Sequence, residues 1–365
     1  MMTYKSDWTE TKRRLTALWN RERLERPCIS VTAPQPVENP SPAPVPEPAD
    51  DEARWLDPDY RVALMRRTLE STWWGGESIP GMTPMAGWVV CLGGTPRFAP
   101  TTIWFETRPV DFDRPSPFRH DPNSPWMARL RKLLLALCAE AGRDGFLVGA
   151  AGGLPANDLL AMLMGTQEFL LALVDHPDWM AEAILTGARD QAQAVTELKT
   201  LIRQAGHEFW YGQTGWMSFW APQPYSGMQS DVSCMLSPEQ YGRFVLPELE
   251  LFAEIHGPLW YHLDGGDAKQ HLLRLLSLPF LRVLQYTPAP FEPPNGPAHL
   301  EMYRRAQRAG KIVHIEVPAE HVEPLVRELD PALLMLQTRA PSRADGERLL
   351  DQCVRWARTA KSEFR

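Results

Sequence analysis

Apolar and polar positions follow two alternating patterns in the last third of the chain. Short apolar runs occur at Leu259–Asp264, Arg282–Thr287, Lys311–Glu316 and Leu333–Arg339. Between and after them, apolar residues recur every three to four positions, which predicts helices near 267–277, 296–309, 319–329 and 342–361. Strands that alternate with helices are typical of parallel strands joined by right-handed crossovers. The pattern therefore predicts a parallel barrel.

The first two thirds of the chain show longer helical patterns and fewer strands. The spacing predicts helices over 5–26, 58–71, 126–141, 157–174, 177–205 and 237–256. Strands are expected at 28–33 and 146–150, and 209–220 is expected to be a strand or a loop. Seven prolines fall within 34–49 and predict an extended loop that lies across the surface.

Polar side chains stand at the ends of the apolar runs. The first run ends in His262 and Asp264 before two glycines, and a later one ends in Glu316. The carboxyl ends of parallel barrel strands are where active sites form. We therefore expect the chemistry of this protein at that end of the strands.

Composition narrows the class of protein. The net charge is −7 and no basic run occurs, so nucleic acid is not expected as a partner. The five cysteines are scattered without a CxxC pair, which is typical of a reduced, cytoplasmic protein. We find no apolar stretch long enough for a membrane span and no signal peptide pattern, so no membrane contact is expected.

His262 and Asp264 lie two positions apart, so both side chains point to one face of the predicted strand. With Glu316 as a third ligand they could hold zinc and leave a position open for water, which is a catalytic arrangement. They could instead act as an acid–base pair or bind substrate hydroxyls. A buried pair that only stabilises the strand end is the third possibility.

Two further residues could react. Asp231 is a candidate general base or hydroxyl-binding group, and we group it with His262, Asp264 and Glu316 as candidate catalytic residues. Cys234 follows it closely, but isolated cysteines without a neighbouring histidine are usually buried apolar residues.

Aromatic and polar residues elsewhere are candidates for substrate binding. An aromatic wall suits stacking on a flat ring or a quaternary ammonium group, and Arg339 could hold a carboxylate or phosphate or pair with Glu316. The predicted substrate-binding residues are Trp104, Glu106, Tyr211, Trp216, Trp220, Gln337 and Arg339.

Several blocks resemble the uroporphyrinogen decarboxylase superfamily, which includes the corrinoid-dependent methyltransferases. Ser230–Pro247 resembles its D-ISC-MLSPE-F--FVLP block, and Asp158–Glu168 resembles its D-LAALRGTE helix. Tyr261–Gly265 is similar to the YHLDG of an uncharacterised decarboxylase-like branch, which Pro58–Arg61 and Thr102–Glu106 also fit. The resemblance implies one (β/α)8 TIM barrel over 1–365. Within 1–140 it implies an N-terminal helix, the proline-rich loop 34–49 and cap elements that cover the barrel mouth.

The departures from these relatives bear on function. The arginine-rich motif with which the decarboxylases grip substrate carboxylates has no counterpart here. The methyltransferases of the superfamily bind zinc through His-x-Cys and a distant cysteine. This chain has His262 and Asp264 in the first motif and no cysteine near Arg339. A thiolate zinc site of the usual form is therefore not expected.

Four functions remain open. The resemblance favours a methyl or one-carbon transferase that acts on a small molecule, with zinc as a possible cofactor and a corrinoid protein as a possible methyl-donor partner. A decarboxylase or other lyase without a cofactor is the second hypothesis. A glycosidase-like hydrolase and a barrel that only binds a ligand are the others. The helix over 237–256 could form a homodimer face.

Overall fold

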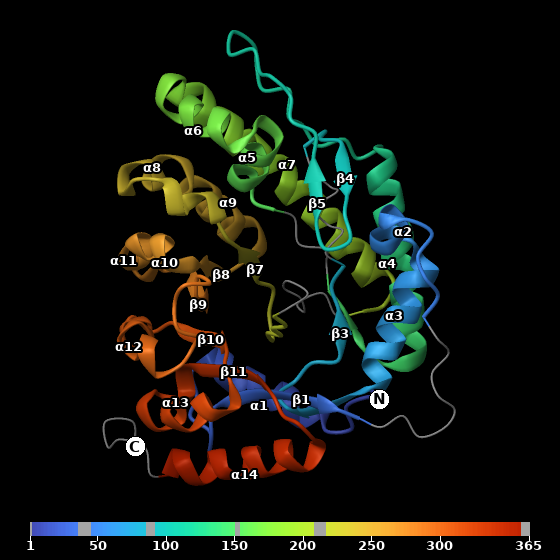
Figure 1. The fold of residues 1–365 in the computed structure, drawn as a ribbon, viewed down its shortest axis with the longest axis vertical. Coiled ribbons are helices and arrows are strands. Elements are labelled where there is room, and N and C mark those ends of the chain that lie inside the picture. Colours follow the sequence, from blue (N-terminus) through green and yellow to red (C-terminus); the bar gives the residue numbers. More distant parts are fainter. Residues whose placement is uncertain (1, 36–44, 85–91, 150–153, 208–216, 359–365) are drawn as a thin grey trace.

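The computed structural model is an α/β fold built on one large sheet, and it describes residues 2–35, 45–84, 92–149, 154–207 and 217–358. The seven strands follow the order β2–β1–β11–β10–β9–β8–β7 (Figure 1). All neighbouring pairs are parallel except β1 and β2. The strands are β1 (Cys28–Pro34), β2 (Thr72–Gly76), β7 (Ser226–Met228), β8 (Leu259–Asp264), β9 (Leu281–Thr287), β10 (Ile312–Glu316) and β11 (Leu334–Arg339).

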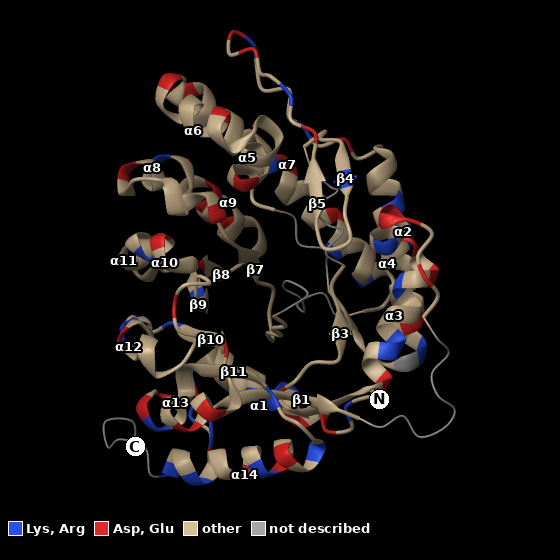
Figure 2. Ribbon diagram, in the orientation of Figure 1, with Lys and Arg blue, Asp and Glu red and all other residues tan. Residues whose placement is uncertain are grey.

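The alternation predicted for the last third of the chain is confirmed. Strands β8 to β11 are separated or followed by the predicted helices, which are shorter than expected because several begin with a 3-10 turn. The helical segments are α10 (Gly265–Ala268), η3 (Lys269–His271), α11 (Leu272–Ser277), η4 (Pro297–His299), α12 (Leu300–Arg308), η5 (Ala319–His321), α13 (Val322–Glu328), η6 (Pro331–Leu333) and α14 (Arg343–Arg358). Figure 2 shows charged residues on these outer helices, while the strands carry few.

A closed eight-stranded barrel is not what the described residues form. Their main sheet is open, with β2 and β7 as its edges. A separate parallel pair, β3 (Gly81–Met82) and β6 (Leu147–Val148), lies across the centre of Figure 1 from β8, β9 and β10. The segments 150–153 and 208–216 lie outside the described residues, and the second of them contains most of the strand or loop predicted over 209–220. The α/β class is confirmed, and the closure of the barrel stays a prediction.

The N-terminal helix α1 (Trp8–Asn20) lies at the end of the sheet where the strands begin. Its buried Leu15, Leu18 and Trp19 belong to one apolar cluster with residues from the first halves of the strands. Those partners are Trp260, Val283, Ile312 and Met335. The prediction that this helix covers the mouth is therefore wrong. Its apolar face packs on the apolar end of the strands, and the opposite end is polar.

The rest of the N-terminal region forms a layer of helices and a hairpin. The strand predicted at 28–33 is confirmed as β1, and most of the proline-rich loop, 36–44, lies outside the described residues. The remaining elements are α2 (Asp51–Leu56), α3 (Pro58–Glu70), β4 (Pro96–Phe98), β5 (Ile103–Phe105) and α4 (Pro125–Asp144).

Two helices predicted as continuous are each divided. The helix over 157–174 becomes α5 and α6, bent by 110° at Gly165, whose φ of +92° suits glycine. The helix over 237–256 becomes α8 and α9, because Pro247 has no N–H to continue the ladder. The bounds are α5 (Ala156–Met164), α6 (Thr166–Asp175), α7 (Pro177–Gln204), η2 (Asp231–Met235), α8 (Pro238–Phe244) and α9 (Leu246–His256).

Among the described residues, no helix by itself has the length and apolar composition needed to cross a membrane. The helices α5 and α6 reach that length and composition only when they are joined across their bend.

Alternation along the strands divides the inward-facing residues into layers. Trp260 of β8 belongs to the apolar layer next to α1, and His262 and Asp264 follow at two-residue steps toward the strand end. On β9 the register places Gln285 beside His262 and Thr287 beside Asp264. The sheet therefore changes from apolar to polar along its length, and the polar end carries the candidate site.

Candidate functional site

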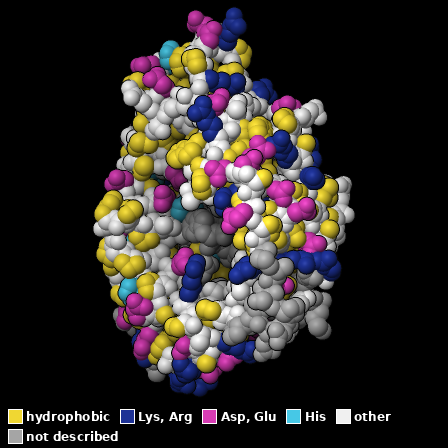
Figure 3. Space-filling model, turned by 45° about the vertical axis from the view of Figure 1, so that its right-hand side comes forward, with side chains coloured by type: hydrophobic (Ala, Val, Ile, Leu, Met, Phe, Trp, Pro, Cys, Tyr) yellow, Lys and Arg dark blue, Asp and Glu magenta, His cyan; other side chains and the backbone are white. Residues whose placement is uncertain are grey.

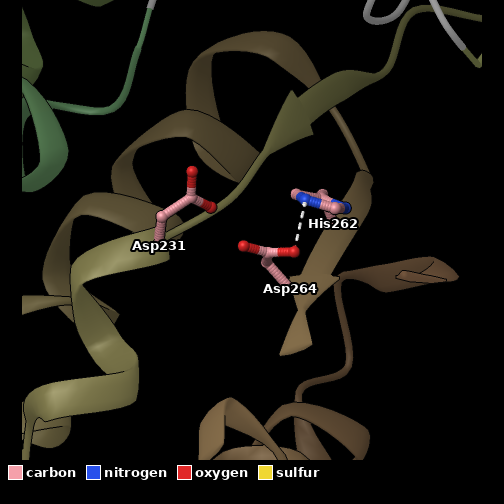
Figure 4. Close-up of side chains that lie close together, drawn as sticks. All are labelled: Asp231, His262 and Asp264. Atoms are coloured by element: carbon pink, nitrogen blue, oxygen red, sulfur yellow. Dashed lines mark ion pairs between the residues drawn. The ribbon is translucent and has the colours of Figure 1, made fainter. Parts of the chain in front are cut away.

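The site is centred on the end of β8. His262 is buried and Asp264 is exposed, and the His262 Nε2 atom lies 3.8 Å from Asp264 Oδ1 (Figure 4). Gly265 follows with a φ of +68°, which a glycine adopts without strain. The chain can therefore turn sharply after Asp264 and leave both side chains at the strand end.

Asp231 joins this pair from a different part of the chain. It begins the short 3-10 helix η2, and Figure 4 shows its carboxylate beside the side chains of His262 and Asp264. One ligand atom from each of Asp231, His262 and Asp264 lies within 4.8 Å of the other two. Figure 3 shows acidic and histidine side chains near each other toward the centre of this face.

The His262 ring is held in one orientation by β9. The Gln285 side chain donates from Nε2 to Thr287 Oγ1 at 3.1 Å, which leaves its Oε1 to accept from His262 Nδ1. Burial lowers the pKa of His262, so the ring is neutral near pH 7. With the proton on Nδ1, the lone pair is on Nε2, the atom that faces Asp264.

Asp231 is positioned through its backbone by Asp158 of α5. The buried Asp158 carboxylate accepts from the backbone N–H groups of Asp231 at 3.0 Å and of Val232 at 2.9 Å. The Gln229 side-chain amide donates to Asp158 Oδ2 at 3.3 Å and to Asp231 Oδ2 at 2.8 Å. Asp158 therefore fixes the start of η2, and Gln229 links the two carboxylates.

α5 is itself anchored by Glu248 of α9. The Glu248 carboxylate accepts from the backbone N–H of Ala156 at 2.5 Å and from the Asn157 side chain at 2.7 Å. Glu248 also accepts from the backbone N–H of Asn157 at 3.3 Å, and both backbone donors lie at the start of the helix, where no intrahelical acceptor is available. Glu248 therefore caps the start of this helix. Asp158 is consequently available to η2.

The cluster carries unbalanced negative charge. None of the ion pairs among the described residues joins Asp158, Asp231 or Asp264 to a lysine or arginine. Partial desolvation, together with the nearby Asp158 and Asp264 carboxylates, raises the pKa of Asp231 to about 8. Burial also raises the pKa of Asp158. A cation placed among these groups would relieve this repulsion.

The residues fit a divalent metal ion. Two carboxylates and an imidazole are ligands for zinc and for harder transition metals. The hydrogen bond from His262 Nδ1 to Gln285 is the outer-shell contact that orients metal-binding histidines. Glu316, expected as the third ligand, pairs instead with Arg339 at 3.9 Å, and Asp231 takes the third place in the described cluster.

The other predicted substrate-binding residues lie in different surroundings. Trp104 is exposed on β5, and Glu106 pairs with Arg97 at 3.0 Å. Trp220 is buried in the apolar cluster that includes α1. Gln337 is half-buried on β11, next to Glu316 in register. Tyr211 and Trp216 lie outside the described residues.

Sequence reasoning missed Gln229, Gln285, Glu248 and the site role of Asp158. Gln285 had a visible signal, because a glutamine at an inward position of an apolar strand needs a buried partner. The Gln229 and Glu248 side chains find their partners only through the fold.

Comparisons with known proteins identify the fold. No family model and no curated protein matches the chain. Among solved structures, the chain is similar to a methyltransferase from Methanosarcina mazei, with a TM-score of 0.55 and 14% sequence identity. The match covers 94% of this chain and 98% of that one. At this identity the likeness shows a shared fold over nearly the full length of both chains.

Proposed function

We propose that this protein is an enzyme that transfers a methyl or one-carbon group from a small molecule. Asp231, His262 and Asp264 would hold a divalent metal ion, zinc or a related cation, at the carboxyl end of β8. The observation that carries the proposal is the meeting of these three side chains with Gln285 behind the imidazole. The fold shared with a methyltransferase supports the choice of reaction.

The residues of the chain have separable tasks in this proposal. His262 presents the Nε2 lone pair because Gln285 holds its other nitrogen. Asp158 keeps Asp231 at the distance at which its carboxylate faces Asp264. A bound metal ion would act as a Lewis acid on the heteroatom that loses the methyl group. When that bond breaks, the heteroatom keeps its electron pair and takes up a proton.

The sequence suggests a corrinoid protein as a methyl donor. In this proposal the corrinoid-carrying partner protein is instead the methyl acceptor, and its cobalt receives the group. The blocks Ser230–Pro247 and Asp158–Glu168, similar to those of corrinoid-dependent methyltransferases, support this choice. A closed (β/α)8 barrel would place β3 and β6 beside β1 and β7 and surround the cluster on all sides.

Elemental analysis of the purified protein tests the metal site. We expect close to one divalent metal per chain in the wild type and loss of that metal in His262→Ala. Buried His256 of α9, which lies against Ala192, offers the control His256→Ala, which should retain the metal. Metal content near zero in the wild type would refute the metal site.

Methyl transfer is tested with free cob(I)alamin as a stand-in acceptor. Methanol, anisole and dimethyl sulfide serve in turn as methyl donors. Cob(I)alamin supplies the electron pair of the new cobalt–carbon bond, and the product is followed by its visible spectrum. Formation of methylcobalamin that depends on His262 is the expected result, and its absence with all three donors would count against methyl transfer.

A lyase is a second candidate because of one specific property of Asp231. A carboxyl group with a pKa of about 8 is protonated near pH 7 and can deliver a proton to a carbanion. A lyase would also need an arginine to hold the substrate acid, and Arg339, our candidate, is exposed and pairs with Glu316. The raised pKa also favours an enzyme over a barrel that only binds a ligand.

A further inference from the structure

The donor atoms of the cluster are oxygen and nitrogen. Asp231 and Asp264 offer carboxylate oxygens, and His262 offers an imidazole nitrogen. Of the cysteines in the described part of the chain (28, 138, 234 and 353), none belongs to the cluster. Cys234 is closest to it in sequence, and its surroundings keep the thiol protonated, since burial and nearby carboxylates raise its pKa. Donors of this kind prefer hard or borderline metal ions to soft ones.

The charge around the cluster points in the same direction. The carboxylates of Asp231 and Asp264 together balance one divalent cation. The carboxylate of Asp158 lies directly behind, linked to Asp231 through Gln229. A substrate that binds as a thiolate would add another negative charge to this region, and no described lysine or arginine pairs with these groups to compensate. A neutral oxygen donor adds no charge.

We infer that this site selects a hard or borderline divalent cation, and that its substrate presents a neutral hydroxyl or ether oxygen to the metal rather than a thiol. The inference rests on the proposed function, because it names the substrate class of the same site. The group that loses its methyl would then be an oxygen, and anisole or methanol would be better donors than dimethyl sulfide.

Metal preference is measured first on the wild-type protein, without any variant. Mn²⁺ and Cd²⁺ are titrated in competition, since both are divalent but differ in their affinity for sulfur. The Asp264→Cys variant then restores a His-x-Cys motif. It should shift the ratio of Cd²⁺ to Mn²⁺ affinity toward Cd²⁺ by about tenfold or more relative to the wild type. An unchanged ratio would show that Asp264 does not ligate the metal and would overturn the inference.

The visible spectrum of the Co²⁺ protein shows whether an oxygen or a sulfur atom of the ligand coordinates the metal. Ethane-1,2-diol and 2-mercaptoethanol are the probes, because they differ in a single donor atom. In the wild type we expect the diol to alter the cobalt bands and 2-mercaptoethanol to give no sulfur-to-cobalt charge-transfer band. Co²⁺-loaded Asp264→Cys shows the position of that band.

The outcomes separate the inference from the proposed function. If Co²⁺ does not bind to the wild type, both the proposed metal site and the inference are refuted. If Co²⁺ binds and 2-mercaptoethanol produces the sulfur band at lower concentration than the diol perturbs the spectrum, the oxygen preference is overturned while the metal site stands.

Discussion

The fold shifts the pKa values of two carboxyl groups, Glu77 and Asp231, in opposite directions. Glu77 is buried beside β1 and accepts from Arg14 at 2.6 Å, from Arg26 at 2.7 Å and from the backbone N–H of Ile29 at 2.6 Å. Although burial alone would raise the pKa of Glu77, these partners hold it below its usual value. At the end of β8, Asp231 has carboxylates as neighbours, and its pKa is raised to about 8.

The difference distinguishes charges that stabilise the fold from charges that a bound cation would neutralise. At Glu77 the chain itself supplies the countercharge, so the group is complete when the protein folds. At Asp231 the chain supplies more negative charge, and folding leaves an electrostatic cost. Perturbed groups of the second kind are typical of functional sites. The two groups should therefore respond in opposite ways when their charges are removed.

The largest effect is expected from Glu77→Gln. This change leaves buried Arg26 without its anion and Arg14 with Glu25 as its remaining acidic partner, and loss of one partner from such a group costs about 3–5 kcal/mol. Urea unfolding measures the loss. A loss below about 1 kcal/mol would mean that water already compensates these arginines.

The next effect concerns the residue behind His262. Gln285→Leu removes the acceptor for His262 Nδ1, and outer-shell changes of this kind lower metal affinity by about 10–100-fold. Calorimetric titration with Zn²⁺ checks this value. Gln307→Leu is the matched control, because buried Gln307 donates to the backbone of Asp330 and Leu333, which precede the start of β11, and it is not part of the cluster. Equal losses in both variants would indicate general damage to the fold.

Asp231→Asn should stabilise the metal-free protein. The folded-state pKa of Asp231, about 8, lies above its usual value of 3.8, so the folded protein binds more protons between these values. Stability therefore falls as the pH rises from about 4 to about 8, and the variant lacks this loss. With solvent screening of this exposed group, we expect a gain of about 1 kcal/mol above pH 8.

Thermal unfolding from pH 3 to pH 9 without metal tests this sign. Glu77 supplies the opposite trend within the same molecule: its pKa is lowered, so its contribution is present above its usual value of 4.5 and is lost as the pH falls through its folded-state pKa. A destabilised Asp231→Asn at pH 9 would show that the carboxylate is compensated.

The smallest effect is expected at the exposed pair of Glu316 and Arg339. Their side chains are 44% and 83% accessible and lie 3.9 Å apart, so Glu316→Gln should change stability by less than about 0.5 kcal/mol. Zn²⁺ affinity should change by less than about twofold, because Glu316 is outside the described cluster. A larger loss of affinity would restore Glu316 as a ligand.

The sequence predicts local structure in this protein better than it predicts contacts between residues that are far apart along the chain. The two-residue step from His262 to Asp264 gave their common face, because alternation is a property of one strand. Asp231 was a candidate on its own, but its distance from that pair depends on how α5 holds η2. The amphipathic pattern of α1 showed that one face is buried without showing which end of the sheet buries it. Gly165 breaks a helix whose apolar spacing continues across it.

The position of α1 has a consequence for how a ligand reaches the site. Leu15, Leu18 and Trp19 fill the end of the sheet where the strands begin. A ligand would therefore reach His262 from the rim formed by the C-terminal ends of the strands. Under the proposed function, the small molecule and the corrinoid protein would both reach His262 from this rim. The corrinoid protein would then bind either on top of the bound small molecule or after the small molecule has left, so the order of binding would become part of the mechanism.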